Sequence, residues 1–168
     1  MRPVGRAEGT SPALADLFRD HHPELVRLAL LMVGDLATAE DVVQDAFEGL
    51  YRSWHGLHQP SSGLAYVRSS VLNGCRSVHR RAAVARKHAP RLAGPATRPD
   101  ELPAAAERGE VAQALRLLPR RQREVLVLRY YLDLDAAEIA ATLQITPGAV
   151  RTTVARGLAA LARKLGED

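Results

Sequence analysis

The chain has 168 residues, enough for one domain or two small ones, and 46% of them are hydrophobic while only 4% are aromatic. A core with few aromatic residues has to rest on Leu, Val and Ala, which suits helices. The single cysteine, Cys75, excludes an internal disulfide, and the N-terminus lacks the apolar segment of a signal peptide, so we expect a soluble cytoplasmic protein.

The net charge of +4 conceals an uneven distribution. Residues 1–48 carry four basic and nine acidic residues, a net −5, whereas residues 49–99 carry nine basic residues and no acidic one, a net +9. Residues 100–168 balance, with ten of each. Because ordinary surfaces mix both signs, 51 residues without a carboxylate favour a polyanionic partner. A membrane surface is the competing interpretation, but no lipidation signal or long apolar run accompanies the charges.

The N-terminal third predicts a leader and two helical segments. Residues 1–12 contain two Pro and two Gly, which is typical of a disordered leader. From Ala13 to about Leu31 an amphipathic pattern predicts one or two helices, with Pro23 as an interruption or a restart. Gly34 and Asp35 mark a break before the next helix.

The next predicted helix, from about Ala37 to Trp54, has two contrasting faces. The inward stripe consists of Val43, Ala46, Phe47, Leu50 and Trp54. The other side gathers Asp41, Gln44, Asp45 and Glu48. Like charges on one face repel mildly unless a basic partner docks there, so this face is either a binding surface or a solvated one.

After a predicted loop at Gly56–Gly63, a third long helix from Leu64 to about Val84 becomes basic toward its end. Its cations, and those just after it, provide phosphate-binding charge: Arg68, Arg76, Arg80, Arg81, Arg86, Lys87 and Arg91. Cys75 and His79 lie four apart and could begin a metal site, but no further ligand follows at metal-site spacing. We therefore expect a structural cysteine, a histidine on the basic face and no bound metal.

Residues 89–108 contain four prolines and a glycine, which predicts a linker and a domain boundary. Four shorter helices are expected beyond it, at about Gly109–Leu117, Arg120–Tyr131, Ala136–Leu143 and Pro147–Leu165. No strand-like alternation occurs. The predicted fold is all-α, with two small helical domains joined by a flexible linker.

The last two of these helices, within Glu138–Lys164, have the pattern of a helix-turn-helix. Asp135 and Glu138 form a predicted capping box, and Thr146 followed by Pro147 predicts the start of the second helix. An apolar face is expected at Val150, Val154, Leu158, Leu161 and Leu165. Small residues, hydroxyls and arginines lie opposite, which suits a major groove, although a helical hairpin with a solvated basic face is the other interpretation.

With both modules in place, the chain resembles an extracytoplasmic-function (ECF) sigma factor, the smallest class of bacterial sigma factor. AEDVVQDAF (Ala39–Phe47) is similar to the acidic helix that binds core polymerase, and AYVRSSVLNGCRSVHRR (Ala65–Arg81) to the helix that reads the minus-ten promoter element. LPRRQREVLVLRYYLDLDAAEIA (Leu118–Ala140) and the helix-turn-helix after it are similar to the domain that reads the minus-thirty-five element. The resemblance implies sigma region 2 at residues 13–88, a linker at 89–108 and sigma region 4 at 109–168.

The resemblance also implies a role for each surface. Core RNA polymerase, through the clamp helices of its largest subunit, would bind Asp41, Gln44, Asp45 and Glu48. The minus-ten DNA would contact Asn73, Arg76, Arg80 and Arg81, with Asn73 and the loop Leu57–Gly63 holding a flipped-out base. The minus-thirty-five duplex would contact Arg151, Thr152, Thr153 and Arg156. An anti-sigma factor often covers these surfaces in the family, and neither a cofactor nor membrane insertion is implied.

Some details depart from the family pattern or have a plainer interpretation. The turn usually has Gly where this chain has Gln144, which must therefore reach the turn geometry with a side chain present. The recognition helix has fewer basic residues than usual after its Val, so no promoter sequence is inferred. Trp54, Tyr66 and His58 are candidate stacking partners for the base, although core packing is the favoured interpretation for Trp54 and Tyr66. Arg120, Arg121 and Arg123 either contact the DNA backbone or form a solvated turn.

Two other classes of protein compete with a sigma factor. An enzyme is not expected, because the chain has no Gly-rich phosphate motif and no Glu-x-x-His pair. A stand-alone helix-turn-helix regulator would bind duplex DNA by itself and would need neither the acidic helix nor a promoter-melting module. A purely protein-binding adaptor would leave the acid-free segment unexplained.

Overall fold

The computed structural model describes residues 11–57, 60–88 and 109–166, and these residues are helical apart from short turns and contain no strand. The elements are α1 (Pro12–Val33), α2 (Leu36–Ser53), a 3-10 helix η1 (Trp54–Gly56), α3 (Pro60–His88), α4 (Glu110–Arg116), α5 (Arg120–Tyr130), α6 (Ala136–Leu143) and α7 (Pro147–Leu165). The predicted all-α fold with two helical domains is confirmed. Residues 1–10 of the predicted leader, and the whole predicted linker at 89–108, lie outside the described residues.

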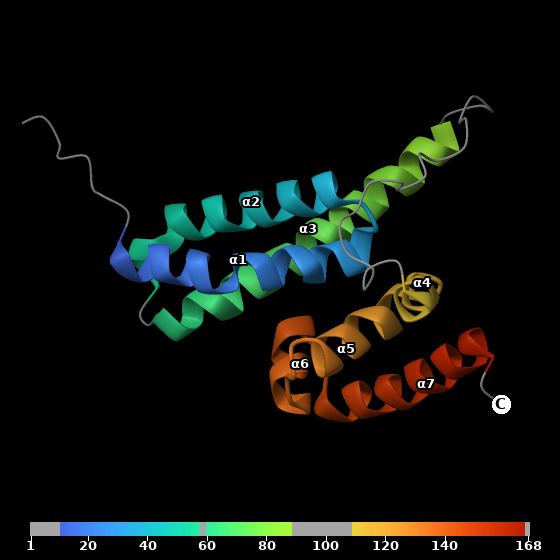
Figure 1. Ribbon diagram of the computed structural model, residues 1–168. Coiled ribbons are helices and arrows are strands. Elements are labelled where there is room, and N and C mark those ends of the chain that lie inside the picture. The colour runs from blue at the N-terminus through green and yellow to red at the C-terminus, as the bar shows by residue number, and fades with distance from the viewer. Residues whose placement is uncertain (1–10, 58–59, 89–108, 167–168) are drawn as a thin grey trace, which may run out of the picture.

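The N-terminal domain is a bundle of α1, α2 and α3 (Figure 1). Helix α1 is one continuous helix that contains Pro23. Pro23 has no N–H to donate to the preceding turn, but it is exposed, so the carbonyl group that loses this hydrogen bond faces solvent. Gly34 ends α1 in the left-handed conformation, at φ 82°, and its N–H donates to the carbonyl oxygen of Leu30 over 2.8 Å. The break predicted here is therefore a single glycine cap.

Asp35 begins α2 as its N-cap. Its Oδ2 accepts hydrogen bonds from the Thr38 backbone N–H, over 2.8 Å, and from the Thr38 hydroxyl, over 2.6 Å. These bonds favour the ionised carboxylate, the side-chain bond most, and lower the pKa of Asp35. Gly34 and Asp35 together set the sharp reversal that brings α2 back along α1.

Helix α3 begins about one turn earlier than predicted and continues one turn further. It packs closely on α2 at Gly74, where an added Cβ would lie 2.8 Å from Val42 Cγ1. Beyond His79 every residue of α3 is exposed, and Figure 1 shows this last part of the helix extending past the bundle. The end of α3 is therefore a solvated arm, which carries Arg80, Arg81, Arg86 and Lys87.

The C-terminal domain contains α4 to α7. Asp135 and Glu138 form the predicted capping box at the start of α6, and Thr146 Oγ1 accepts the Ala149 N–H as the N-cap of α7. Gln144 ends α6 at φ 55°, in the left-handed region where Gly is commoner. Both predicted helices of the helix-turn-helix are thus present with the predicted bounds.

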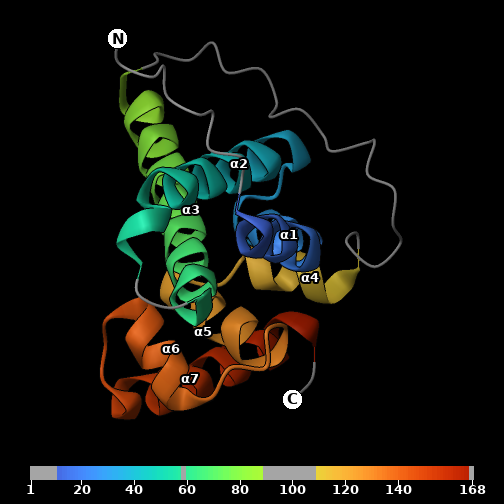
Figure 2. The same cartoon turned by 90° about the vertical axis from the view of Figure 1, so that its left-hand side faces the viewer.

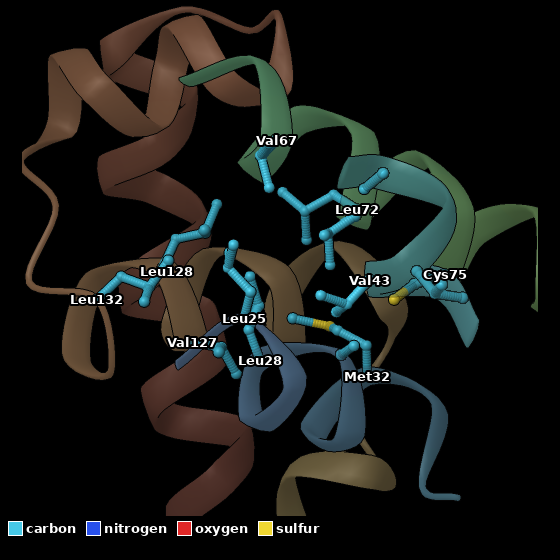
Figure 3. Close-up of a cluster of buried hydrophobic side chains, with 14 of the residues drawn as sticks. Leu25, Leu28, Met32, Val43, Val67, Leu72, Cys75, Val127, Leu128 and Leu132 are labelled. Carbon is cyan, nitrogen blue, oxygen red and sulfur yellow. The ribbon is translucent and has the colours of Figure 1, made fainter. Parts of the chain in front are cut away.

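The two domains pack against each other and share a continuous apolar cluster. Both views show the C-terminal domain lying along one side of the N-terminal bundle, with α5 next to it and α7 on the far side (Figures 1 and 2). In the close-up, Val127, Leu128 and Leu132 from α5 and the turn after it lie beside Leu25 and Leu28 of α1 (Figure 3). This contact was not predicted from the sequence.

Candidate polymerase and nucleic-acid interfaces

The acidic face of α2 is fully available to a partner. Asp41, Gln44, Asp45 and Glu48 are all exposed, and Gln44 Nε2 donates to Glu48 Oε1 over 3.3 Å. The opposite side of α2 packs into the core through the predicted stripe, in which only Trp54 is half-buried rather than buried. The amphipathic pattern of this helix therefore places its carboxylates in solvent.

An apolar groove of about 520 Å³ adjoins this acidic face, between α1 and α2. Phe18 and Tyr51 line it and remain 40% and 51% exposed, which is unusual for large apolar side chains. Phe18 packs edge to face on Phe47, with ring centroids 4.8 Å apart. Gln44 and Glu48 also line the groove, so one continuous surface offers apolar contact and negative charge. Such a surface suits a protein helix with apolar and basic side chains.

The basic surface of α3 is divided between solvent and the domain interface. Asn73, Arg80 and Arg81 are exposed, whereas Arg76 is half-buried. Arg76 Nη1 donates to Asn73 Oδ1 over 3.2 Å, and Arg80 Nη2 donates to Ser77 Oγ over 3.2 Å. The exposed arm of α3 can bind phosphates as it stands, while Arg76 is already paired.

Structural roles account for several residues near the start of α3. Trp54 and Tyr66 pack against the core while remaining partly exposed, as the plainer interpretation predicts. The loop expected at Gly56–Gly63 is shorter than predicted, because α3 begins at Pro60. His58, the third candidate for a stacking partner, lies outside the described residues.

The outer face of α7 has the predicted composition. Arg151, Thr152 and Arg156 are exposed, and Thr153 is half-buried. The apolar face differs from the prediction, since Leu158 is 41% exposed and lines a shallow groove with Val150 and Val154. Gly157 is buried instead, and a Cβ there would lie 3.1 Å from Leu126 of α5. The stripe is rotated because this glycine lets α7 approach α5 closely.

Arg123 is neither a DNA contact nor part of a solvated turn in this structure. Its side chain is buried and donates to the carbonyl oxygens of Leu115 (3.0 Å), Leu118 (3.2 Å) and Met32 (2.7 Å), and also to that of Arg116. Burial, with Arg116 nearby, lowers the pKa of Arg123. Sequence reasoning missed this role because Arg123 begins six consecutive buried residues of α5, a run with no amphipathic period.

Glu124 and His79 are further residues whose roles the sequence did not reveal. The Glu124 carboxylate is 2% exposed and accepts two hydrogen bonds from Arg76. His79 Nε2 lies 2.9 Å from the carbonyl oxygen of Met32. For Glu124, the sequence offers one signal of its role, which is its position directly after the arginine-rich start of α5.

Cys75 is a core residue. It is 2% exposed, and burial, together with the Glu124 charge, raises its pKa to about 12. Within residues 11–57, 60–88 and 109–166 no three His, Cys, Asp or Glu side chains are grouped so that they could hold a metal ion. None of the described helices has both the length and the apolar character needed to cross a bilayer.

Two family models match the chain, one over the N-terminal domain and one over the C-terminal domain. The model for sigma-70 region 2 matches residues 17–84, and the model for sigma-70 region 4 matches residues 108–161. The region 2 match contains the acidic face of α2 and the part of α3 that carries Arg80 and Arg81, and the region 4 match contains α6 and most of α7. A stand-alone helix-turn-helix regulator is not favoured, because such a protein would not need the sigma-70 region 2 that matches residues 17–84.

Curated relatives and solved structures agree with these matches. The ECF RNA polymerase sigma factor SigL of Mycobacterium tuberculosis is 31% identical over 174 residues, which cover 99% of this chain and 96% of SigL. The RNA polymerase sigma-E factor of Streptomyces antibioticus is 28% identical over 159 residues, covering 95% of this chain and 88% of that protein.

Two solved structures extend the likeness to the fold. The structure of CnrH in complex with the cytosolic domain of CnrY is 25% identical, with a TM-score of 0.70 over 96% of this chain and 93% of that one. The sigma factor RpoE in complex with the anti-sigma factor NepR from Bartonella quintana has the same fold at 19% identity, with a TM-score of 0.72 over 92% of this chain and 97% of that one. The matched regions, the full-length relative and the fold together place this chain in the ECF family of bacterial RNA polymerase sigma factors.

Proposed function

We propose that this sigma factor binds core RNA polymerase through the acidic face of α2 and holds two separate stretches of promoter DNA with α3 and α7. The ordered match of sigma-70 regions 2 and 4 carries this proposal. The chain thereby directs promoter recognition and transcription initiation. Its role is regulatory rather than catalytic, and its place of work is the cytoplasm, with the polymerase.

Charge and apolar contact both support the polymerase-binding role of α2. Four exposed polar and acidic side chains share one face, and the groove lined by Phe18 and Tyr51 continues it. The basic residues of a partner helix would be attracted to the acidic face, and its apolar residues would be buried in the groove. We assign Asp41, Gln44, Asp45 and Glu48 to this contact.

The minus-ten contact is assigned to α3. The exposed arm offers Arg80 and Arg81 to phosphates, and Asn73 offers an amide that can pair with the edge of an unstacked base. Arg76 is assigned to the same contact, which requires that its present pairing with Glu124 is broken. Phosphate binding by such an arm is expected to weaken steeply with salt.

The minus-thirty-five contact is assigned to the outer face of α7. Arg151, Thr152 and Arg156 are exposed on the helix that follows the turn, and Thr153 lies at the edge of the same face. In a helix-turn-helix this second helix enters the major groove, where arginine pairs with guanine edges. Arg163 lies two turns further along and is suited to phosphate or solvent.

An anti-sigma factor is the third proposed partner. Of the two solved structures named above, one is the sigma factor RpoE in complex with the anti-sigma factor NepR, and the other is CnrH in complex with the cytosolic domain of CnrY. The groove beside the acidic face of α2 is apolar and exposed, so a regulator that covered it would also block polymerase.

Charge reversal at Asp45 tests the polymerase contact. Asp45→Arg should lower the affinity for core polymerase at least tenfold, because it replaces attraction by repulsion at the centre of the acidic face. Asp20→Arg on α1 makes the same charge change at an exposed site outside that face and should bind as wild type. Affinity is measured by titrating labelled core enzyme, with circular dichroism to verify the fold.

Run-off transcription tests the function itself. Purified core polymerase should initiate at defined start sites on promoter templates only when the wild-type chain is added, and Asp45→Arg should abolish this. If the wild-type chain binds promoter duplex tightly by itself but never confers start-site selection, the protein is a stand-alone regulator and the proposal is wrong.

A further inference from the structure

Helix α7 has a buried glycine in the middle of its length. The buried residues of α7 are Val150 and Gly157. A glycine inside a helix costs stability relative to alanine, because it loses more backbone freedom on folding and has no side chain to pack. A glycine at such a position therefore indicates a neighbour that leaves no room for a methyl group.

That neighbour is Leu126 of α5. A Cβ added at Gly157 would lie 3.1 Å from both Cγ and Cδ1 of Leu126 and 3.4 Å from Cδ2. Carbon atoms in ordinary contact are about 3.5–4.0 Å apart. Turning the two methyl groups of Leu126 cannot make room, since the branch point Cγ is as close as Cδ1. Leu126 is itself buried, within a run of buried residues of α5, so it cannot move aside either.

This contact fixes how α7 is rotated about its own axis. Successive residues of a helix are about 100° apart, so Gly157 lies about 20° to one side of Val150 and Leu158 about 80° to the other. The buried line of α7 runs through Val150 and Gly157, whereas Leu158 is exposed and lines the shallow groove beside Arg129. The Gly157–Leu126 contact therefore determines which side of α7 packs against its domain.

The rotation decides where the two arginines of the outer face lie. Arg151 is about 100° from Val150 in one direction, and Arg156 is about 120° from it in the other. With the buried line between Val150 and Gly157, the two arginines flank the outward face at about equal angles, and both are exposed. If the predicted stripe, centred about 40° toward Leu158, faced the core, Arg151 would be about 60° from the core and Arg156 about 160°. The observed rotation is the one that lets both arginines reach the same groove of DNA.

A second glycine of the same helix has no such contact. A Cβ added at Gly148 would have Thr146 Oγ1 as its nearest neighbour, at 3.9 Å, which is an ordinary contact. Gly148 is exposed near the start of α7, so alanine fits there without any shift. It is a matched control for the effect of alanine on the stability of this helix.

Resting on the function proposed above, we propose that Gly157 is a positioning residue for promoter recognition. Its contact with Leu126 sets the depth and the rotation at which Arg151 and Arg156 are presented to the minus-thirty-five duplex. A methyl group at position 157 moves α7 outward by about 0.5 Å, which is about the tolerance of a geometrically specific site. Phosphate contacts carry no sequence information and are retained after such a shift.

Binding of the holoenzyme to two pools of promoter DNA tests this role. Both pools derive from a promoter at which the wild-type holoenzyme initiates in run-off transcription; one is randomised in its minus-thirty-five segment and the other in its minus-ten segment. Sequencing of bound and unbound DNA gives the preference at each segment. Gly157→Ala should lower the minus-thirty-five preference about tenfold, the size of one arginine–base contact. The minus-ten preference should not change, because α3 has no part in the Gly157–Leu126 contact.

Leu126→Val supplies the rescue. Valine removes one methylene group from the crowded position, so the double variant of Gly157→Ala with Leu126→Val nearly conserves the packed volume. It should regain the wild-type minus-thirty-five preference to within about twofold, since the two positions act through one contact. Gly157→Ala should keep its helical circular dichroism but unfold at a lower temperature than wild type, whereas Gly148→Ala should be at least as stable as wild type.

Three outcomes would overturn the proposal. Unchanged minus-thirty-five preference in Gly157→Ala would show that the contact is structural alone, and an unfolded variant would show that the domain fails rather than that α7 moves. A double variant that regains stability but not preference would show that the effect does not pass through Leu126. Failure of the proposed function is a separate result, because the wild-type holoenzyme would then initiate at no defined site, before any variant is compared.

Discussion

At the scale of single residues, burial decides chemistry in ways that charge counting does not reveal. Arg123, Glu124 and Cys75 are ordinary polar or reactive residues in the sequence, and all three are buried. Arg123 remains satisfied because its N–H groups meet backbone carbonyls, and Glu124 because arginines from two domains surround it. Cys75 agrees with the structural cysteine expected from the sequence, whereas Arg123 was expected to contact DNA or to lie in a solvated turn, and no role was predicted for Glu124.

Cys75 offers a direct test of this burial. At pH 8 a pKa of about 12 leaves about one thiol in ten thousand ionised, so iodoacetamide should react very slowly with the native chain. In guanidinium the thiol should react readily. Because the folded pKa is raised above the ordinary 9.0, this residue favours the folded state fully below pH 9, and that contribution is lost progressively between pH 9 and about 12.

The measurement is alkylation followed by mass spectrometry, with and without denaturant. Rapid modification of the native chain at pH 8 would show that Cys75 is accessible and that the close packing of α2 on α3 is wrong.

At the scale of elements, the rules that depend on neighbouring residues predicted where helices begin and end better than which helix face is buried. The caps at Asp135 and Thr146 and the left-handed Gln144 are confirmed, because capping depends on residues within one turn. Pro23 shows the limit of such rules, since α1 continues through it on the exposed side. The face of α7 was partly wrong for a different reason: Gly157 draws the helix onto Leu126, and only packing reveals that.

Helix α7 carries the prediction that separates base reading from general phosphate binding. Arg156→Ala should lower preference for the correct minus-thirty-five sequence by about 1–3 kcal/mol, up to about two decades, because a bidentate arginine–base contact is lost. Arg163→Ala, on the same helix, should weaken binding to all sequences alike. Competition binding with matched and mutated duplexes measures both, and equal loss of preference in the two variants would contradict the assignment.

At the scale of the whole molecule, we propose that the two domains bind separate stretches of the promoter. Asn73→Ala should lower open-complex formation more than duplex binding, because base capture follows strand separation. Arg156→Ala should lower duplex recognition instead. Since the two side chains act on separate DNA segments, the free-energy losses of the double variant should add within about 0.5 kcal/mol.

Permanganate footprinting and duplex titration, both with the assembled holoenzyme, measure these two steps. Strong coupling between Asn73 and Arg156, or equal loss of both steps in Asn73→Ala, would contradict the division of labour.

The amino-acid sequence by itself determined the helices, most of their ends, the acidic and basic helix faces and the family. These depend on periodicity, caps and charge spacing over short stretches of chain, which are read directly. Only the tertiary structure decided that Glu124 and Arg123 reach across to α3 and α1, and that Arg76 is paired. Such contacts join residues 48 and 91 positions apart, and no local pattern encodes which distant partner a buried ionic group will meet.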